Sequence, residues 1–570
     1  MVIILSEKKR KAQSFEYGAV ILLISTSLVK VIGAVFKIPL SNLIGDLGFG
    51  YFSSAYDLFT PIYSLAMAGL PIAVSRVIAE NVTAGRYRDV KQTLSLARKA
   101  FFVTGFVGLA LMLALIYPFV RITDPTGDTV YSLFAIAPSL LFCCVMSTYR
   151  GYFEGLRNMY PTAVSDIIEA LGKLILGYGF AYITVKLTGN VAYAAAAAML
   201  GITVGAMLAA LYLRLRYNIK GDLITKQELE SSPKPIASRT AMKALILIAI
   251  PVVLSSLANN IASLVDVSMV KWQLGHLIKD HSDTLREMYA ASIADYNTTA
   301  LSALTDEGIP TFLYGIRGKA FTIYNLIPTI TSVLGVSALP VLASSWVLKD
   351  KNKIKHNIDS MLKMTALIAM PAGAGFVALG GQIMGLLYKS TASVEIGAPM
   401  MRIFGFAAVF AGLSIPMTSM LQAIDKQIIP VKNIAIGAVI KIVVNYILVG
   451  IPSVNIKGAP IGTLTCYLFI FIANLWALIK YTGVVPSIMK VFIKPLFAAV
   501  LCGVSAFLIS LVGESKIITL AAILTAVIVY FISLVALNTF EADDVLSLPK
   551  GKTLLKFCEK HKIIRLNLNK

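Results

Sequence analysis

Residues 16–44 read EYGAVILLISTSLVKVIGAVFKIPLSNLI, an apolar run whose interior carries two lysines, Lys30 and Lys37. About 20 mainly apolar residues suffice to cross a bilayer as an α-helix, so this run predicts a membrane-spanning helix. A charge at that depth costs roughly 2.5–3.5 kcal/mol on the insertion scale. It is usually retained because it faces a partner, a wet cavity or a substrate. The run therefore predicts a membrane protein with a place for an anion.

Apolar runs of similar length recur along all 570 residues, which are 57% hydrophobic and 14% charged, with a mean hydropathy of +0.78. This composition excludes an ordinary soluble protein and predicts an all-α polytopic membrane protein of about 14 transmembrane helices. The expected spans are 16–44, 48–79, 97–120, 130–153, 161–187, 190–215, 243–272, 316–348, 361–388, 396–423, 431–450, 458–480, 491–513 and 516–537.

The basic residues are distributed unevenly between the two faces of this topology. Of the 51 Lys and Arg residues, 35 lie in the termini and the even-numbered loops, 10 on the opposite face and 6 inside spans. Since cytoplasmic loops carry an excess of positive charge, both termini are expected in the cytoplasm and the spans in the cell membrane. The net charge of +21 is thus mainly a topology signal. The basic tail is also expected to contact anionic lipids, and no nucleic-acid partner is indicated.

An internal repeat divides the chain. Three landmarks recur at an offset of 269 residues: LPIAVS at 70–75 with LPVLAS at 339–344, Pro161 with Pro430, and Gly189 with Gly458. Each repeat holds six spans, so we expect two like-oriented six-helix lobes related by an axis along the membrane normal, plus two extra C-terminal helices. The expected domains are an N-terminal lobe 1–217, a cytoplasmic linker 218–242, a C-terminal lobe 243–480 with an external insertion 273–315, helices 13–14 at 481–537, and a basic cytoplasmic tail 538–570.

Five motifs carry a family resemblance: KVIGAVFKIPL at 30–40, GFGYFSSAY at 48–56, AGLPIAVS at 68–75, RGYFEG at 150–155 and PTAVS at 161–165. Together they resemble the polysaccharide-transport branch of the multidrug/oligosaccharidyl-lipid/polysaccharide flippase superfamily, which includes stage V sporulation protein B, YtgP-type proteins and MurJ-like lipid II flippases. The resemblance covers nearly the whole chain. It implies a V-shaped transporter of two six-helix bundles that moves an undecaprenyl-pyrophosphate-linked sugar outward.

The resemblance also implies where the substrate binds. In MurJ-like relatives, basic residues of the first, second and eighth helices line the central cavity. By position, Lys30 and Lys37 stand for the first-helix cations and Arg317 for the eighth-helix arginine. Relatives carry an arginine about one turn after the proline of the second helix, whereas this chain has Ile62-Tyr63-Ser64-Leu65 after Pro61, so it departs from the pattern there. For both lysines, snorkelling of the amine to the interface remains the alternative.

Further candidates come from charges placed inside other spans. Asp57 and Arg76 are candidate substrate contacts, although Arg76 is equally explained as an interfacial topology signal. Glu169 and Lys173 form an i,i+4 pair in the favourable order, which predicts a structural ion pair. The alternative is that Glu169 releases its partner to bind a coupling ion. Asp266, with Asn260 about two turns earlier, is a second candidate for coupling Na⁺ or H⁺, or else a structural partner for a cation.

No chemistry of a soluble enzyme accompanies these spans. There is no Walker A sequence, the four histidines lie outside the spans, and the adjacent Cys143 and Cys144 lack metal-ligand spacing. We therefore expect no enzyme activity, no cofactor and no bound metal beyond a possible coupling ion. The leading interpretation is a monomeric flippase for a polyprenyl-pyrophosphate-linked sugar, such as lipid II or a polysaccharide or spore-cortex precursor. The alternatives are a cation-coupled multidrug exporter of the same superfamily, or a polytopic glycosyltransferase or polymerase.

Overall fold

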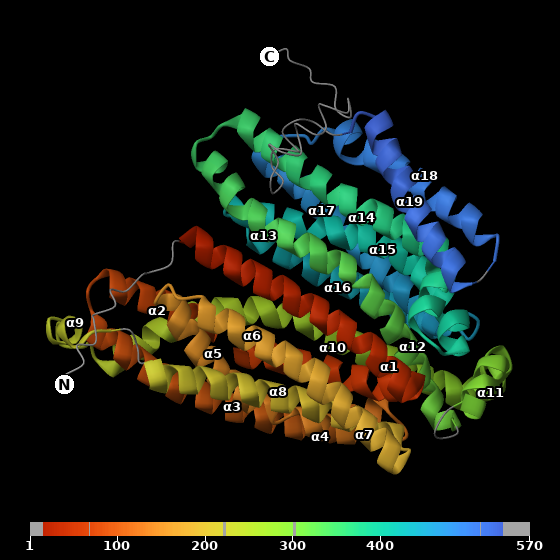
Figure 1. Ribbon diagram of the computed structural model, residues 1–570, viewed down its shortest axis with the longest axis horizontal. Helices are drawn as coiled ribbons and strands as arrows, with labels where there is room; N and C mark the ends of the chain where they lie inside the picture. The colour runs from red at the N-terminus through yellow and green to blue at the C-terminus, as the bar shows by residue number, and fades with distance from the viewer. Residues whose placement is uncertain (1–14, 68, 221–223, 300–303, 514, 540–570) are drawn as a thin grey trace, which may run out of the picture. The chain divides into compact units, whose positions relative to one another are not determined.

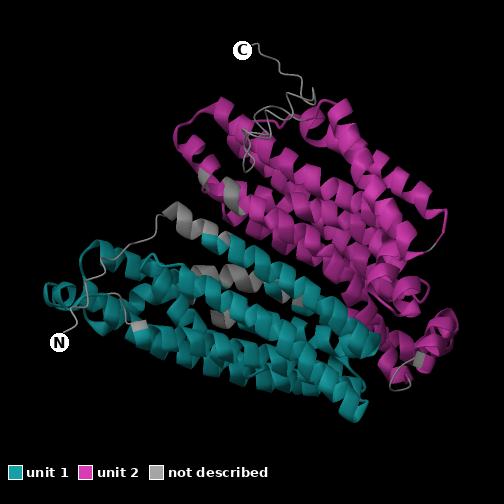
Figure 2. Cartoon of the chain, in the orientation of Figure 1, with its two compact units in different colours: residues 1–268 teal, residues 269–570 magenta. Residues whose placement is uncertain are grey.

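The computed structural model describes residues 15–539, apart from 68, 221–223, 300–303 and 514. Within these ranges every regular element is a helix, as expected for an all-α protein (Figure 1). The chain divides into two compact units, residues 1–268 and 269–570 (Figure 2). The tail from 540 onward lies outside the described residues.

The first unit consists of antiparallel helices and the first part of a long helix shared with the second unit. Its helices are α1 (Phe15–Met67), α2 (Leu70–Thr83), α3 (Tyr87–Thr123), α4 (Thr129–Ile136), α5 (Ser139–Gly155), α6 (Tyr160–Gly172), a π-helical turn (Lys173–Gly177), α7 (Tyr178–Thr188), α8 (Val191–Lys220), α9 (Lys226–Glu230) and α10 (Ser238–Met288) to residue 268.

The second unit contains the rest of α10 and nine further α-helices. These are α11 (Ala290–Thr299), α12 (Ile309–Tyr324), α13 (Leu326–Val347), α14 (Lys351–Leu387), α15 (Thr391–Ala423), α16 (Ile428–Val449), α17 (Gly458–Thr482), α18 (Lys494–Ser510) and α19 (Lys516–Ala536). Short helical turns at Asp306–Gly308, Asn455–Lys457 and Met489–Ile493 precede α12, α17 and α18.

Among the described residues, eleven helices are long and apolar enough to cross a membrane. The three expected spans without a counterpart of their own are 48–79, 243–272 and 316–348. The first is divided, because its part up to Met67 continues α1 and the rest lies in α2, while the other two lie in α10 and in α12 with α13. Side chains of both latter regions are only partly described, so the count of 14 stays a prediction.

Gly45 marks the boundary between the first two expected spans inside α1. It has φ 71° and ψ −173°, a backbone conformation that glycine adopts without the steric penalty of a Cβ atom. The chain therefore changes direction at the position where the two apolar runs of the sequence meet. The first predicted helix and the part of the second up to Met67 are thus two helical segments joined at a single glycine.

Small residues let the helices of each unit approach closely. Gly201 of α8 faces Gly177, and a Cβ atom at Gly201 would collide with the backbone there. A Cβ atom at Gly172 of α6 would lie 2.5 Å from the Cα of Gly205 on α8. Close backbone approach of this kind supplies the van der Waals contact that holds membrane helices together.

The turns that join successive helices repeat between the units. After α5, Arg157 has φ 56°, and the amide of Asn158 donates to the carbonyl of Phe153. After α15, Asp425 has φ 60°, and the amide of Lys426 donates to the carbonyl of Leu421. The two turns share the same residue spacing in their hydrogen bonds, which also ends α13 at Lys349 and Asp350.

The expected linker 218–242 is folded against α3 where it is described. Asp89 of α3 is buried and accepts a hydrogen bond of 2.8 Å from the amide of Ile236, while Arg88 Nε donates to the carbonyl of Leu229 at 3.1 Å. Beyond the linker, Leu245 and Ala249 of α10 join the hydrophobic core of the first unit. Because this part of α10 packs there, the division between the units falls at 268/269, while the predicted lobe boundaries stay a prediction.

Candidate functional site

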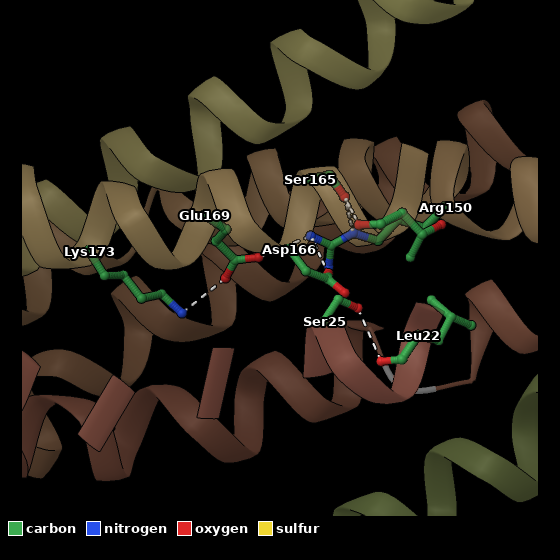
Figure 3. Close-up of polar contacts among 8 residues, drawn as sticks. Leu22, Ser25, Arg150, Ser165, Asp166, Glu169 and Lys173 are labelled. Atoms are coloured by element: carbon green, nitrogen blue, oxygen red, sulfur yellow. Dashed lines mark hydrogen bonds and ion pairs between the residues drawn. The ribbon is translucent and has the colours of Figure 1, made fainter. Parts of the chain in front are cut away.

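A charged network lies between α5 and α6 in the first unit, within two candidate membrane-spanning helices (Figure 3). Arg150 of α5 donates to Asp166 at 2.8 Å and to Glu169 at 3.2 Å, both on α6. Glu169 in turn lies 3.0 Å from the ammonium of Lys173, the first residue of the π-helical turn. The spacing of Glu169 and Lys173 thus gives the close i,i+4 contact expected from the sequence. Arg150 turns that pair into a network of two cations and two carboxylates.

The local sequence fixes the geometry of this network. Asp166, Glu169 and Lys173 recur every three or four residues, so they share one face of the helix. Ser165 accepts a hydrogen bond of 2.9 Å from Arg150 Nε and donates to the carbonyl of Thr162 at 2.7 Å. The four charged side chains keep only 15–24% of their surface exposed. Since their charges balance, the network offsets its own desolvation, which is what a structural ion-pair cluster requires.

An aromatic row on α1 extends from this network towards Lys37. Phe49, Phe52, Tyr56, Phe59 and Tyr63 follow one face of α1, with successive ring centroids 5.5–6.2 Å apart. Tyr56 and Tyr63 are close enough to Lys173 to interact with it electrostatically. The Lys37 ammonium lies 5.3 Å from the Tyr56 ring centroid, within the range of a cation–π contact. Tyr56 therefore links Lys37 to the network.

The other substrate-binding candidates of the first unit are placed differently. Lys30 is exposed and lies two turns before Lys37 on α1. Asp57, the residue after Tyr56, is partly buried. Arg76 is exposed on α2 and pairs with Glu80 of the same helix at 3.0 Å. Such an exposed i,i+4 pair is worth little energetically, and it gives Arg76 a partner outside the network.

The other candidate coupling residues, Asn260 and Asp266, lie on α10. Asn260 donates from Nδ2 to the Ser64 hydroxyl of α1 at 2.8 Å, which ties α10 to α1. Asp266 is buried, with 3% of its surface exposed. Arg150 and Lys173 both lie within 3.2 Å of Glu169, so a coupling ion that binds Glu169 would compete with both.

Buried cations also gather around α12 in the second unit. Arg317 is 4% exposed, and its guanidinium lies 5.2 Å from the Tyr314 ring and 5.1 Å from the Phe321 ring. Lys271 of α10, 1% exposed, lies 5.8 Å from the same Tyr314 ring. Lys319 is equally buried and donates to the Ser393 hydroxyl at 3.0 Å. The second unit thus holds three cations on or beside α12, of which sequence reasoning had selected Arg317.

Three residues were missed for the same reason. Arg150, Lys271 and Lys319 stand near the ends of expected spans, where a basic residue is ordinarily read as a topology signal. The presence of Arg150 in the RGYFEG motif was a usable indication, because that motif carried part of the family resemblance. For Lys271 and Lys319, only the packing of α12 shows that they are buried.

Among the residues that the structure describes, no three His, Cys, Asp or Glu side chains lie close enough together to hold a metal ion. Cys143, Cys144, Cys466 and Cys502 are free and buried. The absence of a cofactor stays a prediction.

Comparison with known proteins agrees with this architecture. The sequence model of the polysaccharide biosynthesis protein family matches residues 17–346, and that of the lipid II flippase MurJ matches residues 269–527. Stage V sporulation protein B of Bacillus subtilis is 23% identical, over 94% of this chain and 98% of the relative. Lipid II flippase MurJ of the same organism is also 23% identical, over 79% of this chain and 80% of its own length.

Solved structures show the same fold. The inward closed conformation of lipid II flippase MurJ covers 90% of this chain and 98% of its own, with a TM-score of 0.58 and 16% identity. An inward-facing multidrug resistance transporter of the same superfamily also gives a TM-score of 0.58, at 15% identity, covering 80% of this chain and 98% of its own. The relatives whose names state an activity are flippases and transporters rather than enzymes. The chain is therefore a multi-pass membrane protein that belongs to the polysaccharide biosynthesis protein family.

Proposed function

We propose that this protein is a flippase that carries a polyprenyl-pyrophosphate-linked oligosaccharide from the inner to the outer leaflet of a bacterial plasma membrane by alternating access. The family, the similarity to stage V sporulation protein B along nearly the full length of both chains, and the MurJ fold support this proposal. Lipid II and a polysaccharide or spore-cortex precursor are the candidate substrates. We further propose that both termini are cytoplasmic and that the protein works as a monomer.

The observation that carries the proposal is Lys30, a cation exposed on α1 two turns before Lys37. A charged side chain at this depth is stable where it meets water or an opposite charge, and the pyrophosphate of the substrate supplies about two negative charges. Lysine ammonium groups attract phosphate as point charges without demanding a fixed geometry, which suits a ligand that must move. Two such groups on one helix can neutralise the diphosphate while its lipid tail stays in the bilayer.

The excess of buried cations in the second unit also favours an anionic substrate. Lys271, Arg317 and Lys319 are each at most 4% exposed, and two of them face the same aromatic ring of Tyr314. We propose that Arg317 contacts phosphate in the second unit, as Lys30 and Lys37 do in the first, with Arg76 and Asp57 contacting the substrate at other stages. A cationic drug would meet unfavourable charge at Lys271 and Arg317 beside Tyr314 and at Lys319 beside Tyr388.

Coupling to an ion gradient is a separate part of the proposal. We propose Asp266 and Glu169 as the candidate coupling carboxylates, and Glu169 would have to release Lys173 and Arg150, which lie within 3.2 Å of it. Asp266 is a buried carboxylate on α10, the same helix in which Asn260 bonds to α1. Binding of H⁺ or Na⁺ to Asp266 would change the charge inside the first unit without breaking the ion pairs between α5 and α6.

The test is flipping by the purified full chain in proteoliposomes that contain a fluorescent undecaprenyl-pyrophosphate-linked oligosaccharide. Lys30→Ala and Lys37→Ala should each slow flipping by about 10- to 100-fold, since a hydrogen bond to a charged group is worth roughly 1.5–3 kcal/mol. Lys186→Ala is the matched control, because its ammonium lies 5.8 Å from the Tyr182 ring near the end of α7, a contact like that of Lys37 with Tyr56.

Parental flipping by Lys30→Ala would refute the site assignment, and no flipping of any lipid-linked sugar by the parent would refute the function. In cells, depletion of the protein should cause one lipid-linked sugar to accumulate on the inner leaflet. The sugar that accumulates identifies which precursor is carried.

A further inference from the structure

A polar pocket of about 310 Å³ lies in the second unit, apart from α12 and its buried cations. It is formed by the first turns of α14 and by the segment that leads into α18. The side chains that matter are Lys355, His356, Asp359 and Lys363 from α14, with Ser487 and Lys490 opposite. The function proposed above assigns no role to any of them.

Asp359 of α14 connects the two sides of the pocket by hydrogen bonds to the segment before α18. Its Oδ1 accepts a hydrogen bond of 2.9 Å from the backbone amide of Ser487, and its Oδ2 accepts one of 2.7 Å from the Ser487 hydroxyl. Beneath this contact, Ile358 and Leu362 of α14 pack in one hydrophobic core with Val484 and Val491. The segment before α18 is therefore fixed against α14, so the pocket is part of the folded unit.

The pocket carries an excess of positive charge. Three lysines line it against the single carboxylate of Asp359, which gives a formal excess of two positive charges with His356 neutral. Lys355 and Lys490 are exposed at its mouth, whereas Lys363 is only 4% exposed. A buried lysine beside a polar pocket, with two further lysines at the rim, suits an anion with several oxygen atoms. Phosphate has that charge and that set of acceptors.

The surroundings of the pocket distinguish a lipid from a soluble phosphate. Val485, Ile488 and Met489 are 56–58% exposed and alternate in sequence with the lining residues Ser487 and Lys490. The candidate membrane spans of α14 and α18 begin at Lys351 and Met489, so the pocket lies where two spans enter the membrane. A phosphate held here would place attached acyl chains beside exposed apolar side chains.

We propose that this pocket binds the phosphate of an anionic phospholipid headgroup, with Lys355, Lys363 and Lys490 as the phosphate-contacting cations. The lysine distribution places this end of the protein on the cytoplasmic side, where anionic headgroups attract basic residues near the membrane surface. The bound lipid is a fixed component of the second unit, distinct from the substrate that is flipped.

Native mass spectrometry of the full chain in detergent can test this proposal by titrating phosphatidylglycerol and phosphatidylcholine. The parent should bind phosphatidylglycerol in preference to phosphatidylcholine. The double variant Lys355→Gln/Lys490→Gln should bind phosphatidylglycerol about 30-fold more weakly, since each lysine near an anionic headgroup contributes roughly fivefold. Both positions are exposed, so the variant should keep the thermal midpoint of the parent.

The matched control is Lys351→Gln/Lys432→Gln, which removes the same charge from two exposed lysines that do not line the pocket. This control should bind phosphatidylglycerol as the parent does. Equal weakening in both double variants would overturn the pocket as a specific site. Competition by inorganic phosphate or glycerol 3-phosphate as effective as that by the lipid would overturn the lipid assignment, because a soluble ligand would then explain the charge. Flipping activity does not enter either readout, so failure here leaves the proposed function intact.

Discussion

The guanidinium of Arg150 on α5 and the carboxylate of Glu169 on α6 lie 3.2 Å apart, although 19 residues separate them in the sequence. This contact makes Glu169 a bridge between Arg150 and Lys173, and it joins α5 and α6 through charge. Removal of either cation leaves the other and two carboxylates, so the balance of the network is lost. The first two predictions follow from this balance.

Arg150→Met should destabilise the first unit. Breaking a buried ion pair by removing one partner costs about 3–5 kcal/mol, because the remaining charges are left uncompensated. The thermal midpoint in detergent should fall clearly. The control is Arg76→Met, whose exposed pair with Glu80 should contribute less than about 1 kcal/mol. Equal midpoints for the two variants would contradict a structural role for Arg150.

A double-mutant cycle on Glu169 and Lys173 separates their structural role from ion coupling. Glu169→Gln and Lys173→Met should each lower the thermal midpoint. Because the two side chains are in contact, the double variant should lose about 1–3 kcal/mol less stability than the summed losses of the two single variants. Flipping by the double variant should keep its dependence on an imposed ion gradient. Loss of that dependence would identify Glu169, rather than Asp266, as the coupling residue.

Gly201→Ala should weaken the packing of α8. The added methyl group collides with the backbone of Gly177, which cannot move as a side-chain tip can, so we expect a loss of about 1–3 kcal/mol. Gly179→Ala is the control, because no atom lies within 4 Å of a Cβ there. Thermal midpoints should fall for Gly201→Ala and stay the same or rise slightly for Gly179→Ala. A neutral Gly201→Ala would show that the helices are not in close contact.

Asp350 should make the start of α14 sensitive to acid. Its carboxylate caps the helix by accepting from the amides of Asn352 and Lys353, and the bond from Lys353 holds the pKa of Asp350 below its usual value. A lowered pKa means that this stabilisation is present above the ordinary value of about 4 and is lost as pH falls through the lower folded-state pKa.

Hydrogen exchange at the amides of Asn352 and Lys353 can measure this effect in the parent and in Asp350→Asn. Asparagine also caps helices but does not titrate, so its protection should be independent of acid. The parent should lose protection as the carboxylate is protonated. Identical acid profiles for the two proteins would exclude a titrating cap.

Much of the fold could be predicted because it rests on local patterns. The apolar runs gave the membrane helices, and the polar break near Gly45 gave the turn between the first two. The packing of α10 could not be predicted in this way, because an apolar helix of uniform composition does not indicate which neighbours it contacts.

The sequence by itself determined an all-helical membrane protein and brought Glu169 and Lys173 together, because hydropathy and i,i+4 spacing act within one helix. Only the tertiary structure decided that Arg150 completes their network, that Tyr56 lies beside Lys37, and that Tyr314 faces both Lys271 and Arg317. These contacts join residues on different helices or different turns of one helix, and they depend on how side chains interlock when the helices pack. Since a basic residue near the end of a span has the same local pattern whether it faces lipid headgroups or the protein interior, packing alone distinguishes the two.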